Sequence, residues 1–536
     1  MTATEAPAVQ AQAPAARPPA ATNPYWGILG VFLGAGIATL NARLLSIGLP
    51  DLRGALGLGV DEASWLPTAL NMATMFSGVF VVFVNVVVGP RRILLSAGAV
   101  FAIVSALLPF APGYWAMLGL IVIAGMASGT FYSLTMTFVL TALPKKLIIF
   151  GIAAYAADIV FVSNFASAIE GWYIAHLSWR WIFWNAAVLT PMMMLCIYRG
   201  IPRPRATAPM PNWRGFAYFS LGFSLLYGAL DQGERLDWLN SGVIVAMGAA
   251  GLFLVTSAYV RRLLQPNPTL NLAFLNRRNI IILAMSIFVF KFEHLASVVL
   301  VPGFLANIQQ YRPIEVGHAL AWVALPMFAV VWMVAAVIIY TSSRLILTFG
   351  LTIAAVTCWV CARVDSSWAG NSFQILELIL AVGFACTYVG LVSSLVLEAL
   401  DSGALGSVAN VATFSGFMHF TRIFGGQIGV AVMTRFISLR EQFHSNLLGL
   451  QVQTGNWLTD DRVRSLTAGL LPSSAGPEEA QQRAVVILGG QVRAQAYTMA
   501  IADAFLLIAW AVAAYLLLML LMRPAKVNYK LLRNMS

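Results

Sequence analysis

Residues 114–142 read YWAMLGLIVIAGMASGTFYSLTMTFVLTA, an apolar stretch without a charged side chain. An α-helix needs about 20 such residues to cross the hydrocarbon core of a bilayer, and about fourteen stretches of this kind account for nearly the whole chain. Hydrophobic residues make up 60% of the sequence and charged residues only 10%. A soluble globular protein of this composition could not cover its apolar surface with polar side chains. The sequence therefore predicts an all-α polytopic membrane protein.

The loops between the apolar stretches differ in basic charge on the two sides of the membrane. The predicted spans are residues 26–48, 64–88, 93–111, 114–142, 147–168, 180–199, 214–230, 241–260, 279–301, 316–340, 345–363, 373–397, 408–435 and 499–522. Alternate loops collect Arg91, Arg92, Lys145, Lys146, Arg199, Arg203, Arg205, Arg214, Arg261, Arg262, Arg277, Arg278, Arg344, Arg523, Lys526, Lys530 and Arg533. The opposite short loops hold only Arg53, Arg180, Arg235 and Arg312. The positive-inside rule then places both termini in the cytoplasm.

The net charge of +11 does not indicate a nucleic-acid partner. The basic side chains are dispersed over loops and do not form one patch or tail. We expect them to lie near anionic lipid headgroups, so membrane lipids are predicted partners and nucleic acid is not.

The order of the spans indicates a duplicated transporter. Residues 1–23 are rich in Ala and Pro and are predicted to form a disordered cytoplasmic tail. Residues 24–200 hold six spans, 201–276 a linker with two inserted spans, and 277–536 six more spans. Two six-helix bundles facing each other across a cavity would show this count. Within the second half, residues 436–498 are predicted to lie outside the membrane.

A specific resemblance begins at residues 171–185, GWYIAHLSWRWIFWN. This run resembles the signature of the fourteen-helix drug/proton antiporters (EmrB/QacA-like) of the major facilitator superfamily. Residues 49–73 and 231–278 are similar to further parts of that family. The matching signature residues are Ser178, Trp179, Arg180, Trp181, Phe183 and Asn185, with Gly425, Gly426 and Gly429 in a later span. The resemblance implies a major facilitator fold of two six-helix bundles plus two inserted helices.

Within this family the long last outer loop looks like that of the EmrB-like component of tripartite efflux pumps. The segments 438–444 and 495–505 carry this likeness. In that type, the resemblance implies, a bacterial inner-membrane transporter meets a periplasmic membrane-fusion adaptor and, through it, an outer-membrane channel. A loop of this size without any partner is the alternative.

The chain departs from the family at residues that carry proton coupling. Asn41 stands where the family has a proton-titrating Asp, and it cannot carry a proton in and out. Arg43 lies two residues further along the same helix and should face the cavity or an acidic side chain, because exposure to lipid is costly. The Arg of the fourth span is replaced by Ile121, and Glu170 stands where the fifth-span motif has Gly. In the loop after the second span, Gly89, Arg91 and Arg92 remain of the superfamily's gating motif.

Proton coupling must then use other ionisable groups within the spans, where burial costs at least about 2.5 kcal/mol. Lys291, Glu293 and His294 follow closely on one predicted helix and could present a titratable cluster to the cavity. The remaining candidates are Asp158, Glu170, Glu377, His419 and Arg422. The alternative roles are structural. Lys291 would be the static partner of Glu293 and His294, Arg43 or Arg180 would pair with Asp158 and Glu170, and Arg422 would pair with a carboxylate and hold the bundle. Glu377 would be solvated near a span boundary.

No motif of an enzyme is present. The sequence contains no P-loop, no HExxH and no Ser/His/Asp arrangement. Cys358 and Cys361 have CxxC spacing but lie in a span without a His or acidic neighbour in sequence, so we expect no metal and no cofactor.

The sequence predicts a secondary active transporter that exports amphipathic organic compounds or drugs by alternating access, with proton antiport. One alternative is a dedicated exporter of a native metabolite or lipid-like molecule with altered or no proton coupling. The other is a transport-inactive subunit of transporter-like fold.

Overall fold

The computed structural model describes residues 24–142, 148–201, 213–264, 277–401 and 408–522. These residues form helices and no strands, which confirms the all-α prediction. The first part contains α1 (Pro24–Ile47), α2 (Leu49–Leu56), α3 (Val60–Val88), α4 (Pro90–Leu107), α5 (Tyr114–Ala142), α6 (Ile148–His176) and α7 (Trp181–Gly200). Next come α8 (Trp213–Gln232) and α9 (Gly242–Leu264). The last part contains α10 (Arg278–Leu295), α11 (Val301–Asn307), α12 (Pro313–Ile338), α13 (Ser343–Cys361), α14 (Gly370–Asp401), α15 (Val408–Gly449), α16 (Trp457–Leu470) and α17 (Pro477–Met519).

Twelve helical segments of the described chain are long and apolar enough to cross a membrane. One of them runs from Arg278 to Asn307, because α10 continues through a π-helical turn at Ala296–Leu300 into α11. The predicted span 279–301 is therefore too short at its C-terminal end. α8 and α15 lie where two further spans were predicted but are not among the twelve, so the count of fourteen spans stays a prediction, as does the side on which the termini lie.

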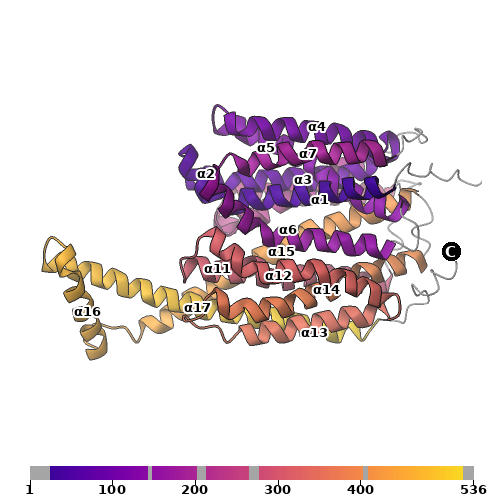
Figure 1. Ribbon diagram of the computed structural model, residues 1–536. Coiled ribbons are helices and arrows are strands. Elements are labelled where there is room, and N and C mark those ends of the chain that lie inside the picture. Colours follow the sequence, from indigo (N-terminus) through magenta and orange to yellow (C-terminus); the bar gives the residue numbers. More distant parts are fainter. Residues whose placement is uncertain (1–23, 143–147, 202–212, 265–276, 402–407, 523–536) are drawn as a thin grey trace, which may run out of the picture.

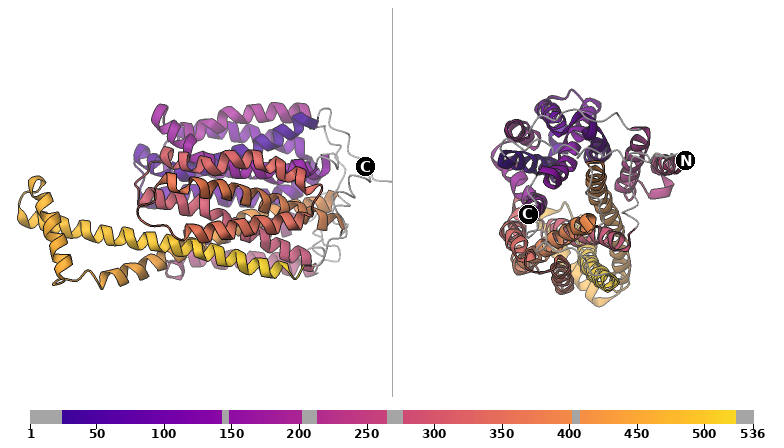
Figure 2. Two further views of the ribbon diagram at one scale, coloured as in Figure 1. Left: turned by 60° about the horizontal axis from the view of Figure 1, so that its bottom comes forward. Right: turned by 90° about the vertical axis from the view of Figure 1, so that its right-hand side faces the viewer.

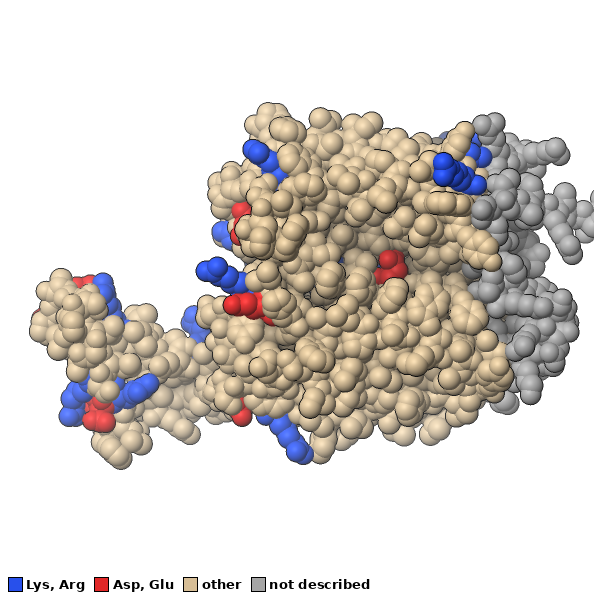
Figure 3. All heavy atoms as spheres, in the orientation of Figure 1, with Lys and Arg blue, Asp and Glu red and all other residues tan. Residues whose placement is uncertain are grey.

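The long helices are packed side by side into two groups (Figures 1 and 2). The first group, which we call the first bundle, contains α1, α3, α4, α5, α6 and α7. The second bundle contains α10 to α15 and α17. The pair α8 and α9 lies beside them, with α8 against α3 and α15. The groups meet along α6 and α12 and along α3 and α15. On the face that Figure 3 shows, most charged side chains gather on a projection and at the end of the molecule that carries it, and only one acidic side chain lies in the broad band between the two ends.

The projection consists of the end of α15, α16 and the start of α17 (Figure 1). α15 has 42 residues and α17 has 43. At 1.5 Å per residue each helix is about 60 Å long, which is twice the thickness of the hydrocarbon core. At its base Asp503 of α17 binds Arg440 (2.6 Å) and His444 (2.7 Å) of α15. The predicted outer segment 436–498 is thus largely helical and continuous with two bundle helices.

Candidate functional site

Four charged side chains from four helices lie between the two bundles. They are Arg43 of α1, Asp158 of α6, Lys291 of α10 and Arg422 of α15, and each is half-buried. The charges of Arg43 and Arg422 both act on Lys291, and Arg422 acts on Asp158. We call these four residues the central charge cluster.

Three tyrosines surround Arg422. Its guanidinium lies 3.7 Å from the ring centroid of Tyr132 on α5, a cation–π contact. Tyr132 forms a hydrogen bond with Thr39 of α1. The rings of Tyr155 on α6 and Tyr388 on α14 lie 6.4 Å apart and join the two bundles. None of the three tyrosines was among the residues predicted from the sequence, although their position in the middle of apolar spans, away from the interfacial ends, was a usable signal.

Asp158 fits closely against α1. A Cβ atom on Gly36 would lie 2.6 Å from its Oδ1 atom, so the glycine makes room for the carboxyl group. The Oδ2 atom is buried without a hydrogen-bond partner. Asp158 forms no ion pair within 4.0 Å with any described residue, so the expected static pair with Arg43 or Arg180 is not formed.

Lys291, Glu293 and His294 do not meet in one place. Glu293 is fully buried inside the second bundle, where it accepts a hydrogen bond from Thr387 (3.3 Å). His294 is buried against the rings of Phe290 and Phe384. Only Lys291 belongs to the central charge cluster, because residues two positions apart on a helix point about 200° apart. The expected pair of Glu293 with Lys291 is not formed among the described contacts.

Two other candidates lie inside the packing. Glu377 of α14 is fully buried and acts electrostatically on Cys358 and Cys361 of α13. The structure thus gives this CxxC pair an acidic neighbour that is distant in sequence. No group of three or more metal-binding side chains occurs in the described part of the chain. His419 of α15 packs against Gly78 of α3, where any Cβ atom would overlap its ring, and lies beside Tyr132 (6.1 Å).

Two residues that depart from the family pattern, Asn41 of α1 and Glu170 of α6, are also buried. Asn41 is buried within the first bundle. Glu170 is fully buried near the C-terminal end of α6, beside Gly48, and neither of its carboxyl oxygens has a hydrogen-bond partner among the described residues.

The residues that remain of the gating motif connect helices of the first bundle. Gly89 joins α3 to α4 with φ +87° and ψ 150°, a conformation essentially restricted to glycine. Arg91 donates a hydrogen bond to the carbonyl of Tyr198 on α7 (2.8 Å) and lies over its ring. Arg92 is exposed.

The signature residues shape a turn and a helix contact. Ser178, Trp179 and Arg180 precede α7, which begins at Trp181, and Asn185 donates to the carbonyls of Trp181 and Ile182. Phe183 is buried. On α15 the three signature glycines face α10: a Cβ atom on Gly425 would lie 2.9 Å from Phe288, and Cβ atoms on Gly426 and Gly429 would lie 3.6 Å from the Lys291 stem and from Phe292. Their small size lets the two helices approach closely.

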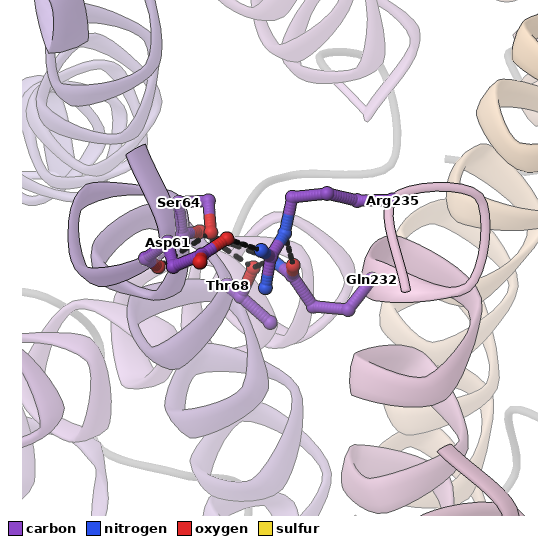
Figure 4. A network of polar contacts seen from close by, with 5 residues as sticks. All are labelled: Asp61, Ser64, Thr68, Gln232 and Arg235. Atoms are coloured by element: carbon purple, nitrogen blue, oxygen red, sulfur yellow. Dashed lines mark hydrogen bonds and ion pairs between the residues drawn. The ribbon is translucent and has the colours of Figure 1, made fainter. Parts of the chain in front are cut away.

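A polar network holds the end of α8 to the start of α3 (Figure 4). Arg235 forms an ion pair with Asp61 and a hydrogen bond to Gln232, whose amide in turn donates to Thr68 and to the carbonyl of Ser64. The neighbouring Asp231 accepts hydrogen bonds from Thr68 of α3 and Gln427 of α15 (2.8 Å). The inserted helix thus contacts both bundles.

The bundles approach most closely along α6 and α12. A Cβ atom on Gly317 would lie 2.5 Å from the backbone of Ala168, and one on Gly171 would lie 2.6 Å from Ile314. Deeper in the membrane, Ser297 donates a hydrogen bond to Asn164 (2.9 Å) across the same interface.

Comparison with known proteins gives consistent matches. The family model described as Major Facilitator Superfamily matches residues 31–425. The multidrug export protein EmrB of Haemophilus influenzae is 22% identical over 423 residues, which is 78% of this chain and 82% of that protein. The fatty acid resistance protein FarB of Neisseria gonorrhoeae is 22% identical over the same shares of the two chains. The crystal structure of the human organic anion transporter MFSD10 is similar in fold, with a TM-score of 0.53 and 14% identity over 91% of this chain and 99% of that chain.

Proposed function

Because this chain belongs to the Major Facilitator Superfamily, whose members are transporters and not enzymes, we propose that it exports amphipathic organic compounds by alternating access with proton antiport. It is an EmrB-like, multi-pass protein of the bacterial inner membrane. The central charge cluster carries the proposal, because its residues come from both bundles and their charges act on one another. A ligand bound there contacts both bundles, so their relative movement can carry it from one side to the other.

Asp158 is the proposed proton carrier. It lies in the centre, where an ionised carboxylate without a partner is costly and a protonated one is not. Glu293, Glu377 and Glu170 are buried in the packing or at the outer end, so a proton bound by any of them would have to act on the substrate site indirectly.

The experiment is transport by the purified protein in proteoliposomes. A fluorescent amphipathic compound is offered with an inward-directed or outward-directed proton gradient and with none. We expect movement against the direction of the proton gradient, and faster movement with the gradient than without it. Protein-free liposomes are the control.

An exporter without proton coupling is the second candidate. It is favoured by Asn41 and Ile121, which replace the family's first-span Asp and fourth-span Arg. Transport at equal rates with and without the gradient would support it over antiport. No movement of any compound would point to a transport-inactive subunit.

The projection is proposed to bind a periplasmic adaptor, and an outer-membrane channel through it. Side chains on it such as Leu450, Trp457 and Val486 are 66%, 72% and 75% exposed, and exposed apolar side chains outside the membrane are typical of interaction surfaces. In cells, replacement of residues 451–476 by a short Gly/Ser turn should abolish export across the envelope while transport in proteoliposomes persists. Unchanged export by cells would mean that the projection has no such partner.

A further inference from the structure

We propose that the substrate is an amphipathic organic anion whose carboxylate or phosphate group binds among Arg43, Lys291 and Arg422. This inference rests on the proposed export function and names the substrate class of the same site.

The argument begins with the charge balance between the bundles. The central charge cluster has three cationic side chains and one acidic one. Among the described residues no carboxylate lies within 4.0 Å of Arg43, Lys291 or Arg422. The remaining acidic side chains of the surrounding helices lie elsewhere: Glu170 beside Asp51, Asp231 at the outer end, Glu293 and Glu377 inside the second bundle, and Glu398 with Arg344. The centre therefore has an excess of positive charge.

Positive charges placed together in a region of low dielectric repel each other strongly. Burial of a cation within a membrane is also costly unless an opposite charge or a hydrogen-bond acceptor compensates it. An anion between the three cations would supply both the opposite charge and the hydrogen-bond acceptors. The protein itself provides only Asp158, whose place against Gly36 is fixed by close packing.

The unsatisfied donors have the chemistry that recognises an acid group. The Nε atoms of Arg43 and Arg422 are buried and have no hydrogen-bond partner. A guanidinium presents its donors as a fork that matches the two oxygens of a carboxylate or phosphate. Tyr155 and Tyr388 lie near Arg422, and their hydroxyl groups can donate to further oxygens of the same ligand.

The surroundings of Lys291 also suit an apolar ligand body. Phe288 and Phe292, on the same helix, line an open apolar groove of about 180 Å³ between α10, α15 and α17. The Lys291 stem packs on Gly426, next to Gly425 in the wall of this groove. Charged and apolar binding surfaces are thus adjacent on one pair of helices, as an amphipathic ligand requires.

The test compares three probes in proteoliposomes: a fluorescently labelled alkyl carboxylate, and the alkylamine and alcohol with the same chain and label. We expect the carboxylate to move about tenfold faster than the amine or more, because charge-assisted hydrogen bonds favour it. Labelled phosphatidylglycerol is a fourth probe. Movement of the free carboxylate indicates a soluble acid as the substrate, and movement of the phospholipid indicates a membrane lipid; either supports the anion site.

Variants connect the selectivity to the three cations. Arg43→Gln and Arg422→Gln should each raise the KM for the anion about tenfold or more, while Arg43→Lys, which keeps the charge, should retain most of the affinity. Arg363→Gln is the matched control, because Arg363 is exposed and lies over Trp359 at the end of α13. Elution of each variant as one monodisperse peak shows that it is folded.

Transport of the amine in preference to both anions would overturn the inference and leave the proposed export function intact. Equal transport of anions by the folded Arg43→Gln and Arg422→Gln variants would overturn the site. If no probe of any charge moves, both the inference and the proposed export function fail.

Discussion

Asp158→Asn is expected to abolish gradient-driven export while downhill movement of the substrate persists. The amide matches the carboxyl group in size, so it fits against Gly36 of α1, but it cannot bind and release a proton. The measurement is uptake into proteoliposomes with and without an imposed proton gradient. The expected result is a rate that no longer depends on the gradient.

Two further variants make this experiment decisive. Asp365→Asn is the control for the loss of a carboxylate: Asp365 lies in the loop after α13, and hydrogen bonds from the Ser367 side chain and backbone hold its pKa below the usual range. With its pKa lowered, Asp365 stays ionised near neutral pH, so it exchanges no proton in a gradient of that range. Glu293→Gln tests whether Glu293 carries the proton instead of Asp158. Gradient dependence that survives in Asp158→Asn and disappears in Glu293→Gln would contradict the role given to Asp158.

Gly317→Val is expected to stop transport by holding the outer halves of the bundles apart. A Cβ atom at this position would lie 2.5 Å from the backbone of Ala168, and backbone atoms at a helix contact cannot move aside as a flexible side chain can. Overpacking of this kind typically costs about 1–3 kcal/mol. We expect transport near background in proteoliposomes, together with an open outer interface.

The opening can be measured by thiol labelling. A cysteine placed at Ser297, which is fully buried at the bundle interface beside Asn164, should react with a membrane-impermeant reagent added outside only when Gly317→Val is also present. Gly119→Val is the matched control, because nothing lies within 4 Å of its Cβ position on α5. Normal transport by Gly317→Val would show that close contact of α6 with α12 is not part of the cycle.

The sequence by itself determined the membrane class and the positions of most helices. Hydropathy over about 20 residues is a local property, and the bilayer imposes it on every span. For the same reason residues 114–142 were assigned correctly to one helix, α5. Helices α8 and α15 are more polar, and only packing against their neighbours accounts for their place in the bundle.

Only the tertiary structure decided which ionisable side chains meet. Lys291, Glu293 and His294 are close in sequence, yet the turn of the helix directs Glu293 into the second bundle and leaves Lys291 in the centre. Arg43 and Arg422 are 379 positions apart by their residue numbers, and both act on Lys291. Local patterns fix helices, whereas a binding site between two bundles depends on how the helices pack, because each helix contributes one or two of its side chains.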